Sequence, residues 1–222
     1  DDVVARQGGG AAVPQRPSAP PAPEIVTIPL GEGPVIGSTD APIALVEFTD
    51  YQCPFCKRFG NEIMPELQTK FVSTGKLKLV ARQLPLDFHK QAVPAARAVL
   101  CAHKLGKYEP FRKELFNKQE SLSDETILAA AEAAGMKAEA FKACLADTAA
   151  LEPTLLADGA AAKAAGITGT PSFVVGKVTD GKVTGLKIVG VSTAAMFVGE
   201  IEKQLATLAP APAAEQKPKP KS

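Results

Sequence analysis

Several residues and patterns that mark common protein classes are missing from this chain. Of its 222 residues none is tryptophan and only two are histidine, and neither a Ser-His-Asp set nor a phosphate-binding glycine loop occurs. An excess of positive charge is also missing, since the formal net charge is +1, which argues against a nucleic-acid or anionic-lipid surface. No apolar run approaches the roughly 20 residues of a membrane span. What remains is a globular chain, 45% hydrophobic, with four cysteines.

The two ends of the chain differ in composition from its centre. Residues 1–23 and 210–222 are rich in proline and alanine, and they have too few large apolar side chains to offset their ordering entropy. We expect a disordered linker at 1–23, a disordered tail at 210–222 and a folded unit between them. The chain begins with Asp1 rather than methionine, which a removed signal peptide or membrane anchor, or a trimmed end, would each explain.

The first half of the folded unit has strand and helix patterns in alternation. Residues 43–49 form a near-continuous apolar run, which predicts a strand covered on both faces. A helix is predicted from Pro54, which suits a first helical position, and Pro65 should kink it. A second, alternating strand is predicted at 77–82. The apolar stripe of the helix consists of Phe55, Phe59, Ile63, Leu67 and Phe71.

In the second half of the folded unit, apolar residues first recur at intervals typical of helices, and strand patterns then follow. Residues 90–166 are rich in alanine and predict four or five short helices. Strands are predicted at 172–176 and 186–190, joined by a turn at Asp180-Gly181, and a last helix follows. The order predicts an α/β fold in which 24–88 and 167–209 form one discontinuous domain and 89–166 an inserted helical domain.

Cys53-Pro54-Phe55-Cys56 is the most informative motif, because it falls between the first strand and the start of the helix. Free N–H groups and the helix dipole favour negative charge at a helix N-terminus, and the thiolate is the reactive form of cysteine. We therefore predict that Cys53 is the exposed, acidic nucleophile and that the more buried Cys56 is the resolving thiol. Half of a zinc site is the alternative, but no second Cys-x-x-Cys or His-x-x-x-His supplies the other ligands.

Gly169-Thr170-Pro171 precedes the third predicted strand and is the second informative motif. A cis bond before Pro171 would place the backbone groups of Thr170 beside the cysteines, where they could pair with an extended substrate. A plain turn is the commoner meaning of Thr-Pro alone. Together with the cysteine motif, it indicates a thiol–disulfide oxidoreductase.

The chain resembles the DsbA-like thioredoxin-fold oxidoreductases, in which helices are inserted between two halves of a thioredoxin core. The resemblance covers about residues 35–208, and its matching segments are 46–56, 84–89 and 166–173. It implies that Cys53 and Cys56 are the redox pair, that Pro171 is a cis-proline, and that no cofactor or metal is needed. It also implies that Glu47 is a buried acid able to take the proton of Cys56, although a strand-edge carboxylate in water would be an ordinary alternative.

The other two cysteines, Cys101 and Cys144, fall in the helical block. Four cysteines allow three pairings, and a second pair favours an oxidising compartment. Many members of the family carry a structural disulfide in this region, so the resemblance implies a Cys101–Cys144 disulfide; two free buried thiols are the alternative. The chain departs from the best-known oxidising members at Phe55, where they have histidine. Phenylalanine cannot stabilise the thiolate, so we expect a less oxidising disulfide, with help from Lys57 or Arg58.

The resemblance leads to an expected function. We expect a monomeric, exported, periplasmic or otherwise extracytoplasmic enzyme that introduces or exchanges disulfides in cysteine-containing polypeptides, with a membrane reoxidase or reductase as partner. A reductase or isomerase of the same fold, or a redox-inactive peptide-binding module, would be an alternative. Residues 1–34 are too short and polar for the dimerisation domain of such isomerases. We assign surface, capping or structural roles to His89 and His103.

Overall fold

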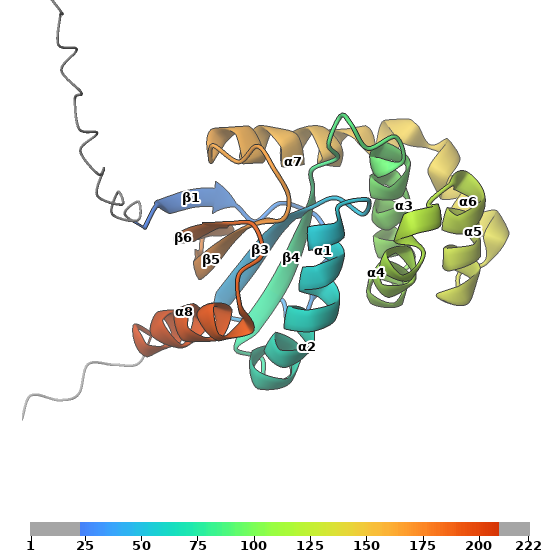
Figure 1. The fold of residues 1–222 in the computed structure, drawn as a ribbon. Coiled ribbons are helices and arrows are strands. Elements are labelled where there is room, and N and C mark those ends of the chain that lie inside the picture. Colours follow the sequence, from blue (N-terminus) through green and yellow to red (C-terminus); the bar gives the residue numbers. More distant parts are fainter. Residues whose placement is uncertain (1–22, 209–222) are drawn as a thin grey trace, which may run out of the picture.

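The computed structural model describes residues 23–208, which form a mixed sheet flanked by helices and, to one side, a bundle of short helices (Figure 1). The predicted linker and tail lie outside the described residues, except for Pro23. The six strands have the order β1-β6-β5-β3-β4-β2. They are β1 (Ile25–Pro29), β2 (Val35–Ile36), β3 (Ile43–Thr49), β4 (Leu77–Gln83), β5 (Ser172–Thr179) and β6 (Lys182–Val189).

The four predicted strands form the centre of this sheet. β3 and β4 are parallel, whereas β5 pairs antiparallel with both β3 and β6. The turn between β5 and β6 is the predicted one, and both Asp180 and Gly181 have positive φ, as a two-residue hairpin turn requires. The outer strands β1 and β2 were not predicted. β2 has only two residues, and the prolines and glycines around both strands hide an alternating pattern.

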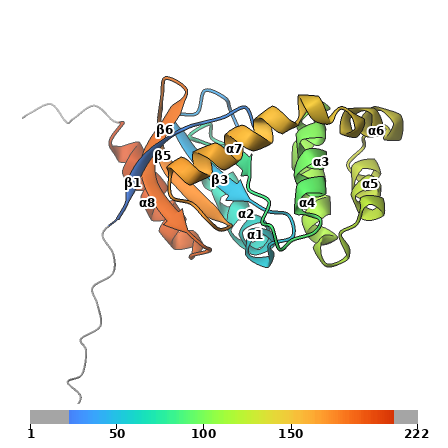
Figure 2. The same ribbon diagram turned by 90° about the horizontal axis from the view of Figure 1, so that it is seen from above.

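Strand β3 is buried on both faces, as its apolar run predicts. Ile43 and Leu45 join the core beneath the helix that begins at Pro54, while Val46 and Phe48 join a second core beneath α7 (Glu152–Ala164). α8 (Ala194–Ala206) packs beside the first helix (Figures 1 and 2). Helices therefore cover both faces of the sheet. All seven residues of β4 are buried as well, because α7 covers the face that its alternating pattern would leave to solvent.

The first helix runs without interruption from Pro54 to Val72, but its winding changes. It consists of α1 (Pro54–Arg58), the π-helical η1 (Phe59–Ile63), α2 (Met64–Leu67) and the π-helical η2 (Gln68–Val72). Pro65 follows directly after η1 and the first residue of α2, so the wider π turn lies where the proline lacks an N–H to donate. Of the predicted apolar stripe, all members except Phe55 are buried.

The predicted helical block contains five α-helices. Figure 2 shows that α7 crosses the sheet and leads away from the other four, so it belongs to both parts of the molecule. A disulfide joins Cys101 of α3 to Cys144 of α6, with their Cα atoms 5.8 Å apart. The division at residues 89 and 166 stays a prediction. Besides α7, the block comprises α3 (Ala92–Lys104), α4 (Tyr108–Asn117), η3 (Gln119–Ser121), α5 (Asp124–Ala133), α6 (Ala138–Ala146) and η4 (Thr148–Ala150).

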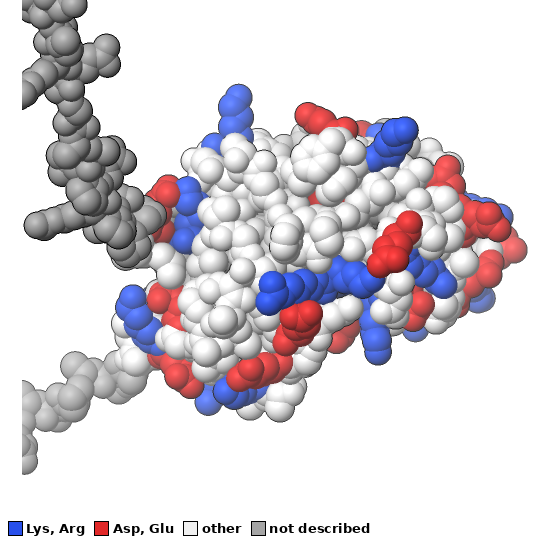
Figure 3. Space-filling model, in the orientation of Figure 1, with Lys and Arg blue, Asp and Glu red and all other residues white. Residues whose placement is uncertain are grey.

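One face of the molecule gives no sign of a single-charge interface (Figure 3). On the face shown in Figure 3, acidic and basic side chains lie among one another, with uncharged surface between them. This mixture agrees with the net charge of +1. None of the helices between residues 23 and 208 combines the length and the apolar composition that crossing a bilayer requires.

Candidate active site

The two cysteines of the motif lie at the start of the first helix, shortly after β3 ends at Thr49. Cys53 is the N-cap residue of α1, with extended backbone, and Pro54 occupies the first turn, where its missing N–H costs nothing. The carbonyl of Cys53 accepts hydrogen bonds from the N–H groups of Cys56 and Lys57, at 3.1 and 3.2 Å. Both cysteines are thiols in the structure, and Cys56 lies one turn below Cys53.

The sulfur of Cys53 faces the loop that precedes β5. The Thr170–Pro171 peptide bond is cis, and the Cys53 thiol donates to the carbonyl of Thr170 at 3.3 Å. A hydrogen bond from the Cys56 thiol, opposed by burial and helped by the side chain of Thr170 and by the N–H groups of Cys56 and Phe55, lowers the pKa of Cys53 from 9.0 to about 5. The prediction that Cys53 is exposed is wrong, because only 4% of its surface is accessible once this loop packs against it.

Cys56 is fully buried, as predicted. Burial raises the pKa of its thiol well above 9.0, and the hydrogen bond to Cys53 and the negative charge of Glu47 add to this effect. The N–H of Asp50, 3.5 Å from the sulfur, acts in the opposite direction. The two sulfurs therefore differ strongly in acidity, which is the arrangement that separates a nucleophile from a resolving thiol.

Glu47 is buried on β3, on the same side of the strand as Ile43 and Leu45, so it is not a strand-edge carboxylate in water. Arg112 of α4 binds both of its carboxylate oxygens: Nη1 lies 2.8 Å from Oε2, and Nη2 donates to Oε1 at 3.1 Å. Nη1 also donates to the hydroxyl of Tyr108 at 3.0 Å, and Tyr108 lies 3.5 Å from the hydroxyl of Tyr51. Burial raises the pKa of both tyrosines. The inserted helices thus supply the charge that offsets Glu47.

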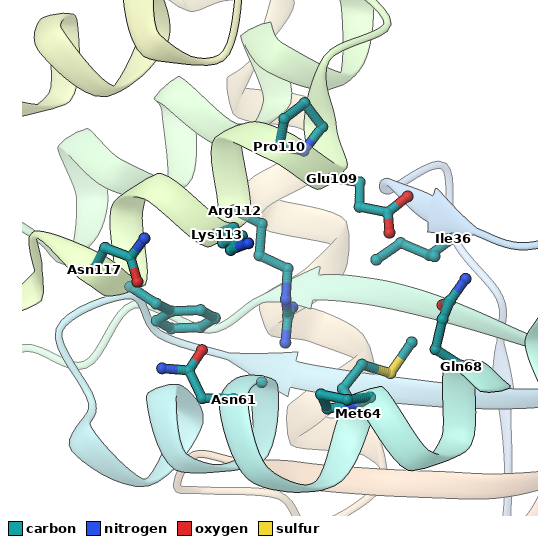
Figure 4. A pocket seen from close by; sticks show the side chains of 12 residues that line it. Ile36, Asn61, Met64, Gln68, Glu109, Pro110, Arg112, Lys113 and Asn117 are labelled. Atoms are coloured by element: carbon teal, nitrogen blue, oxygen red, sulfur yellow. The ribbon is translucent and has the colours of Figure 1, made fainter.

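A groove of about 680 Å³ between the first helix and α4 leads from the surface to Arg112. In Figure 4 the side chain of Arg112 extends from α4 into the groove, toward the strands, between Asn61 and Met64 on one side and α4 on the other. Gly60 permits the close approach of the two helices, because a Cβ atom there would lie 3.2 Å from the ring of Phe116. The groove therefore gives solvent a way to Arg112, which pairs directly with Glu47.

The inserted helices also hold the backbone of the cysteine loop. The side-chain nitrogen of Gln119 in η3 donates to the carbonyls of Tyr51 and Cys53, both at 2.9 Å. The carbonyl of Cys53 also accepts N–H groups of the first helical turn, whereas the amide of Gln119 is the donor to the carbonyl of Tyr51. The amide thus satisfies a buried acceptor that water would otherwise have to reach. The conformation of the loop thus depends on Gln119, which lies 68 positions after Tyr51 and 66 positions after Cys53 in the sequence.

The cations expected to help Cys53 make other contacts. Lys57 lies 3.9 Å from Glu120, and Arg58 donates to Glu62 within its own helix at 3.0 Å. Phe55, between the cysteines, has 56% of its surface in solvent. The acidity of Cys53 therefore rests on hydrogen bonds rather than on a neighbouring cation.

Among residues 23–208, no group of three or more His, Cys, Asp or Glu side chains has an arrangement that could hold a metal ion. The Cys101–Cys144 pairing, implied by the resemblance, is present in the structure.

Fold and site together define a thioredoxin-like protein with a dithiol at the start of its first helix and a helical insertion. The chain belongs to the thioredoxin family, since the family model described as Thioredoxin matches residues 30–185. The predicted resemblance and the predicted α/β thioredoxin-like fold are confirmed.

Several known proteins are similar to this chain. "Disulfide bond formation protein D" of Bacillus subtilis is 34% identical over 99 residues, which are 42% of this chain and 43% of that protein. A putative protein-disulfide oxidoreductase of Rickettsia bellii is 28% identical over 149 residues, 65% of this chain and 57% of that protein. The chain thus spans about half the length of these curated relatives. The crystal structure of α-DsbA1 from Wolbachia pipientis is 25% identical, with a TM-score of 0.69, over 81% of this chain and 94% of that one.

Several residues of the site were not predicted from the sequence. Arg112 carried a signal, because a charged residue falls in the buried helical stripe of Tyr108, Phe111 and Leu115. Asp50 and His89 lie within the segments that carry the resemblance, yet only a surface or capping role is predicted for His89. In the structure its ring lies 2.8 Å from the buried carboxylate of Asp50. Gln119 carried no signal, because its partners are backbone carbonyls.

Proposed function

We propose that this protein is a thiol–disulfide oxidoreductase that introduces or exchanges disulfides in cysteine-containing polypeptides through Cys53 and Cys56. The observation that carries the proposal is the pairing of an acidic thiol, with a pKa of about 5, with a buried thiol one helical turn away. At neutral pH the first sulfur is ionised and the second is not, so each has a distinct role in exchange.

In the oxidising direction the cycle begins with the Cys53–Cys56 disulfide. A substrate thiolate attacks Cys53, the bond between the two enzyme sulfurs breaks, and Cys56 leaves as a thiolate that takes up a proton. A second substrate thiolate then attacks the substrate sulfur of the mixed disulfide and releases Cys53 as a thiolate. The substrate gains a disulfide, and its two electrons remain on the enzyme dithiol.

Two groups near the sulfurs support this cycle. The carbonyl of Thr170, 3.3 Å from the Cys53 sulfur, lies where an extended substrate beside Pro171 would pair with the backbone. Glu47, which raises the pKa of Cys56, is the buried acid suited to exchange a proton with that sulfur.

The proposal extends to location and partners. We propose an exported, extracytoplasmic protein that acts as a monomer and is restored by a membrane reoxidase or reductase. The disulfide in the helical block supports an oxidising compartment. The names of the Bacillus and Rickettsia proteins support disulfide chemistry as the shared activity.

The test is an equilibrium titration of the Cys53–Cys56 pair against reduced and oxidised glutathione, together with refolding of a reduced, unfolded test protein. We expect a defined reduction potential and a gain of native disulfides in the test protein. A very negative potential without oxidative refolding would favour a reductase instead.

The Cys53→Ser variant separates an enzyme from a redox-inactive peptide-binding module. We expect this variant to lose refolding activity, since its hydroxyl cannot form the mixed disulfide. Retention of full activity by Cys53→Ser would contradict the proposal.

A further inference from the structure

Asp50 follows β3 directly and contacts both cysteines of the site through its backbone. Its N–H points at the sulfur of Cys56 at 3.5 Å, and its carbonyl accepts the N–H of Cys53 at 3.1 Å. Its backbone thus joins the start of the helix to the resolving sulfur.

The carboxylate of Asp50 is completely buried and is held by three donors. Oδ1 accepts the N–H of Gln52 at 2.8 Å, and Oδ2 accepts the N–H of Leu86 at 2.9 Å. The third donor is Nδ1 of His89, 2.8 Å from Oδ2. A carboxylate oxygen only accepts hydrogen bonds, so Nδ1 carries the hydrogen.

His89 is the one side chain among these donors, and it comes from a different segment of the chain. It lies in the loop between β4 and α3, where the edge of its ring contacts Phe88, and 19% of its side chain is exposed. A buried carboxylate that loses a donor loses much of the free energy that holds it in place. His89 therefore helps fix the backbone of Asp50, and with it the N–H that faces Cys56.

We propose that His89 and Asp50 form a positioning pair for the resolving sulfur: the imidazole holds the carboxylate so that the N–H of Asp50 can stabilise the thiolate of Cys56. The proposal rests on the thiol–disulfide exchange proposed above. His89 and Asp50 touch no substrate in this scheme and act through the backbone.

The pair would matter in both directions of exchange, because Cys56 becomes a thiolate in each. When a substrate thiolate attacks Cys53 of the disulfide, the Cys53–Cys56 bond breaks and the electron pair stays on Cys56. In reverse, the Cys56 thiolate attacks Cys53 of a mixed disulfide, the enzyme disulfide forms, and the substrate leaves as a thiolate that takes up a proton. In both steps the Asp50 N–H faces the developing or reacting charge.

The experiment compares three substitutions in the full chain. Asparagine places its amide nitrogen where Nδ1 of histidine lies, whereas glutamine places it one bond further out and alanine has no donor. For each variant the reduction of the Cys53–Cys56 disulfide by reduced glutathione is followed by stopped-flow. We expect His89→Ala and His89→Gln to react about tenfold more slowly, the effect of one lost hydrogen bond, and His89→Asn to stay within about threefold of the unchanged protein.

A second measurement separates positioning from general loosening of the fold. Alkylation of Cys53 by iodoacetamide in the reduced protein reports the nucleophile alone, and we expect its rate to change by no more than about twofold in all three variants. The His103→Ala variant is the matched control, because His103 is the other histidine of the chain and lies exposed on α3. It should equal the unchanged protein in both measurements.

The outcomes distinguish this inference from the proposed function. If the unchanged protein does not exchange with glutathione, the proposed function is wrong and the inference falls with it. If the unchanged protein exchanges and His89→Gln is as fast, or His89→Asn is as slow as His89→Ala, the inference alone is overturned. Should His89→Ala not fold, the comparison of His89→Gln with His89→Asn decides.

Discussion

Phe55 stands between the two cysteines and carries neither a charge nor a hydrogen-bond donor on its side chain. The thiolate of Cys53 therefore depends on Cys56, on Thr170 and on backbone N–H groups. Stabilising a thiolate stabilises the reduced form, and a disulfide whose reduced form is more stable is a stronger oxidant. The residue at position 55 should thus tune the direction in which electrons flow.

Replacing Phe55 by histidine tests this dependence. We expect Phe55→His to be more oxidising, by about 30 mV for each tenfold gain in the equilibrium constant, because an imidazolium can donate to the Cys53 thiolate. The potential is measured by equilibration with glutathione. Phe55→Leu serves as the control and should match the unchanged protein; a potential in Phe55→His that is unchanged or more reducing would count against the argument.

The titration of Cys53 gives a second prediction at this scale. With its pKa lowered from 9.0 to about 5, the rate of alkylation by iodoacetamide should rise around pH 5 and be level at neutral pH. Because ionisation favours the folded reduced protein, its free energy of unfolding, relative to Cys53→Ala, should increase from about pH 5 to pH 9 and be lost as the pH falls through 5. The rate of iodoacetamide alkylation and urea unfolding, each followed at several pH values, measure the two effects. A rate that keeps climbing toward pH 9 would show an ordinary thiol.

Among the elements, α4 and β3 are joined by a buried ion pair rather than by apolar packing alone. Arg112 is 5% exposed and Glu47 is fully buried, and the guanidinium also lies over the ring of Phe116. Removing one partner of such a pair leaves an uncompensated buried charge, which costs more than the pair itself contributes.

We expect Arg112→Met to lower the free energy of unfolding by about 3–5 kcal/mol, measured by urea denaturation. Lys113→Met, at the exposed neighbouring position, is the matched control and should change it by less than about 0.5 kcal/mol. The double variant Glu47→Gln/Arg112→Met should lose less than Arg112→Met, because it leaves no lone charge. Equal losses in both would mean that packing, not charge, dominates at Arg112.

At the scale of elements, the sequence predicted what periodicity and local motifs determine. The apolar run of β3, the stripe of the first helix and the turn at Asp180 each depend on neighbours within a few residues. The Glu47–Arg112 pair was missed because its partners are 65 positions apart, and only the fold brings them together. The burial of Cys53 was missed for the same reason, since the covering loop at Thr170 is 117 positions away.

For the molecule as a whole, the Cys101–Cys144 disulfide closes a segment of 43 positions within the inserted helices. Such a loop restricts the unfolded chain, and in the chain-entropy model it contributes about 4 kcal/mol. It lies outside the cysteine motif and joins α3 to α6.

The double variant Cys101→Ala/Cys144→Ala should therefore be less stable by about 4 kcal/mol or somewhat less, measured by urea unfolding under oxidising conditions. Exchange of Cys53–Cys56 with glutathione at moderate temperature should persist, because the site residues remain. As a control, the same double change in the Cys53→Ala background, which retains no cysteine pair, should have the same stability with and without a reductant. Undiminished stability of the oxidised double variant would contradict the entropy argument.

Gln119 has a consequence for any attempt to shorten this protein. Excising the helices between β4 and α7 to reach a minimal core would remove the amide that caps two carbonyls of the cysteine turn, and the guanidinium opposite Glu47 as well. Such a trimmed protein would keep its sheet and its thiols, but the buried carbonyl of Tyr51 would lose its donor, and Glu47 would lose the cation that pairs with it. The inserted helices are therefore part of the active site. A shortened protein would need a new donor for the carbonyl of Tyr51 and a new cation for Glu47.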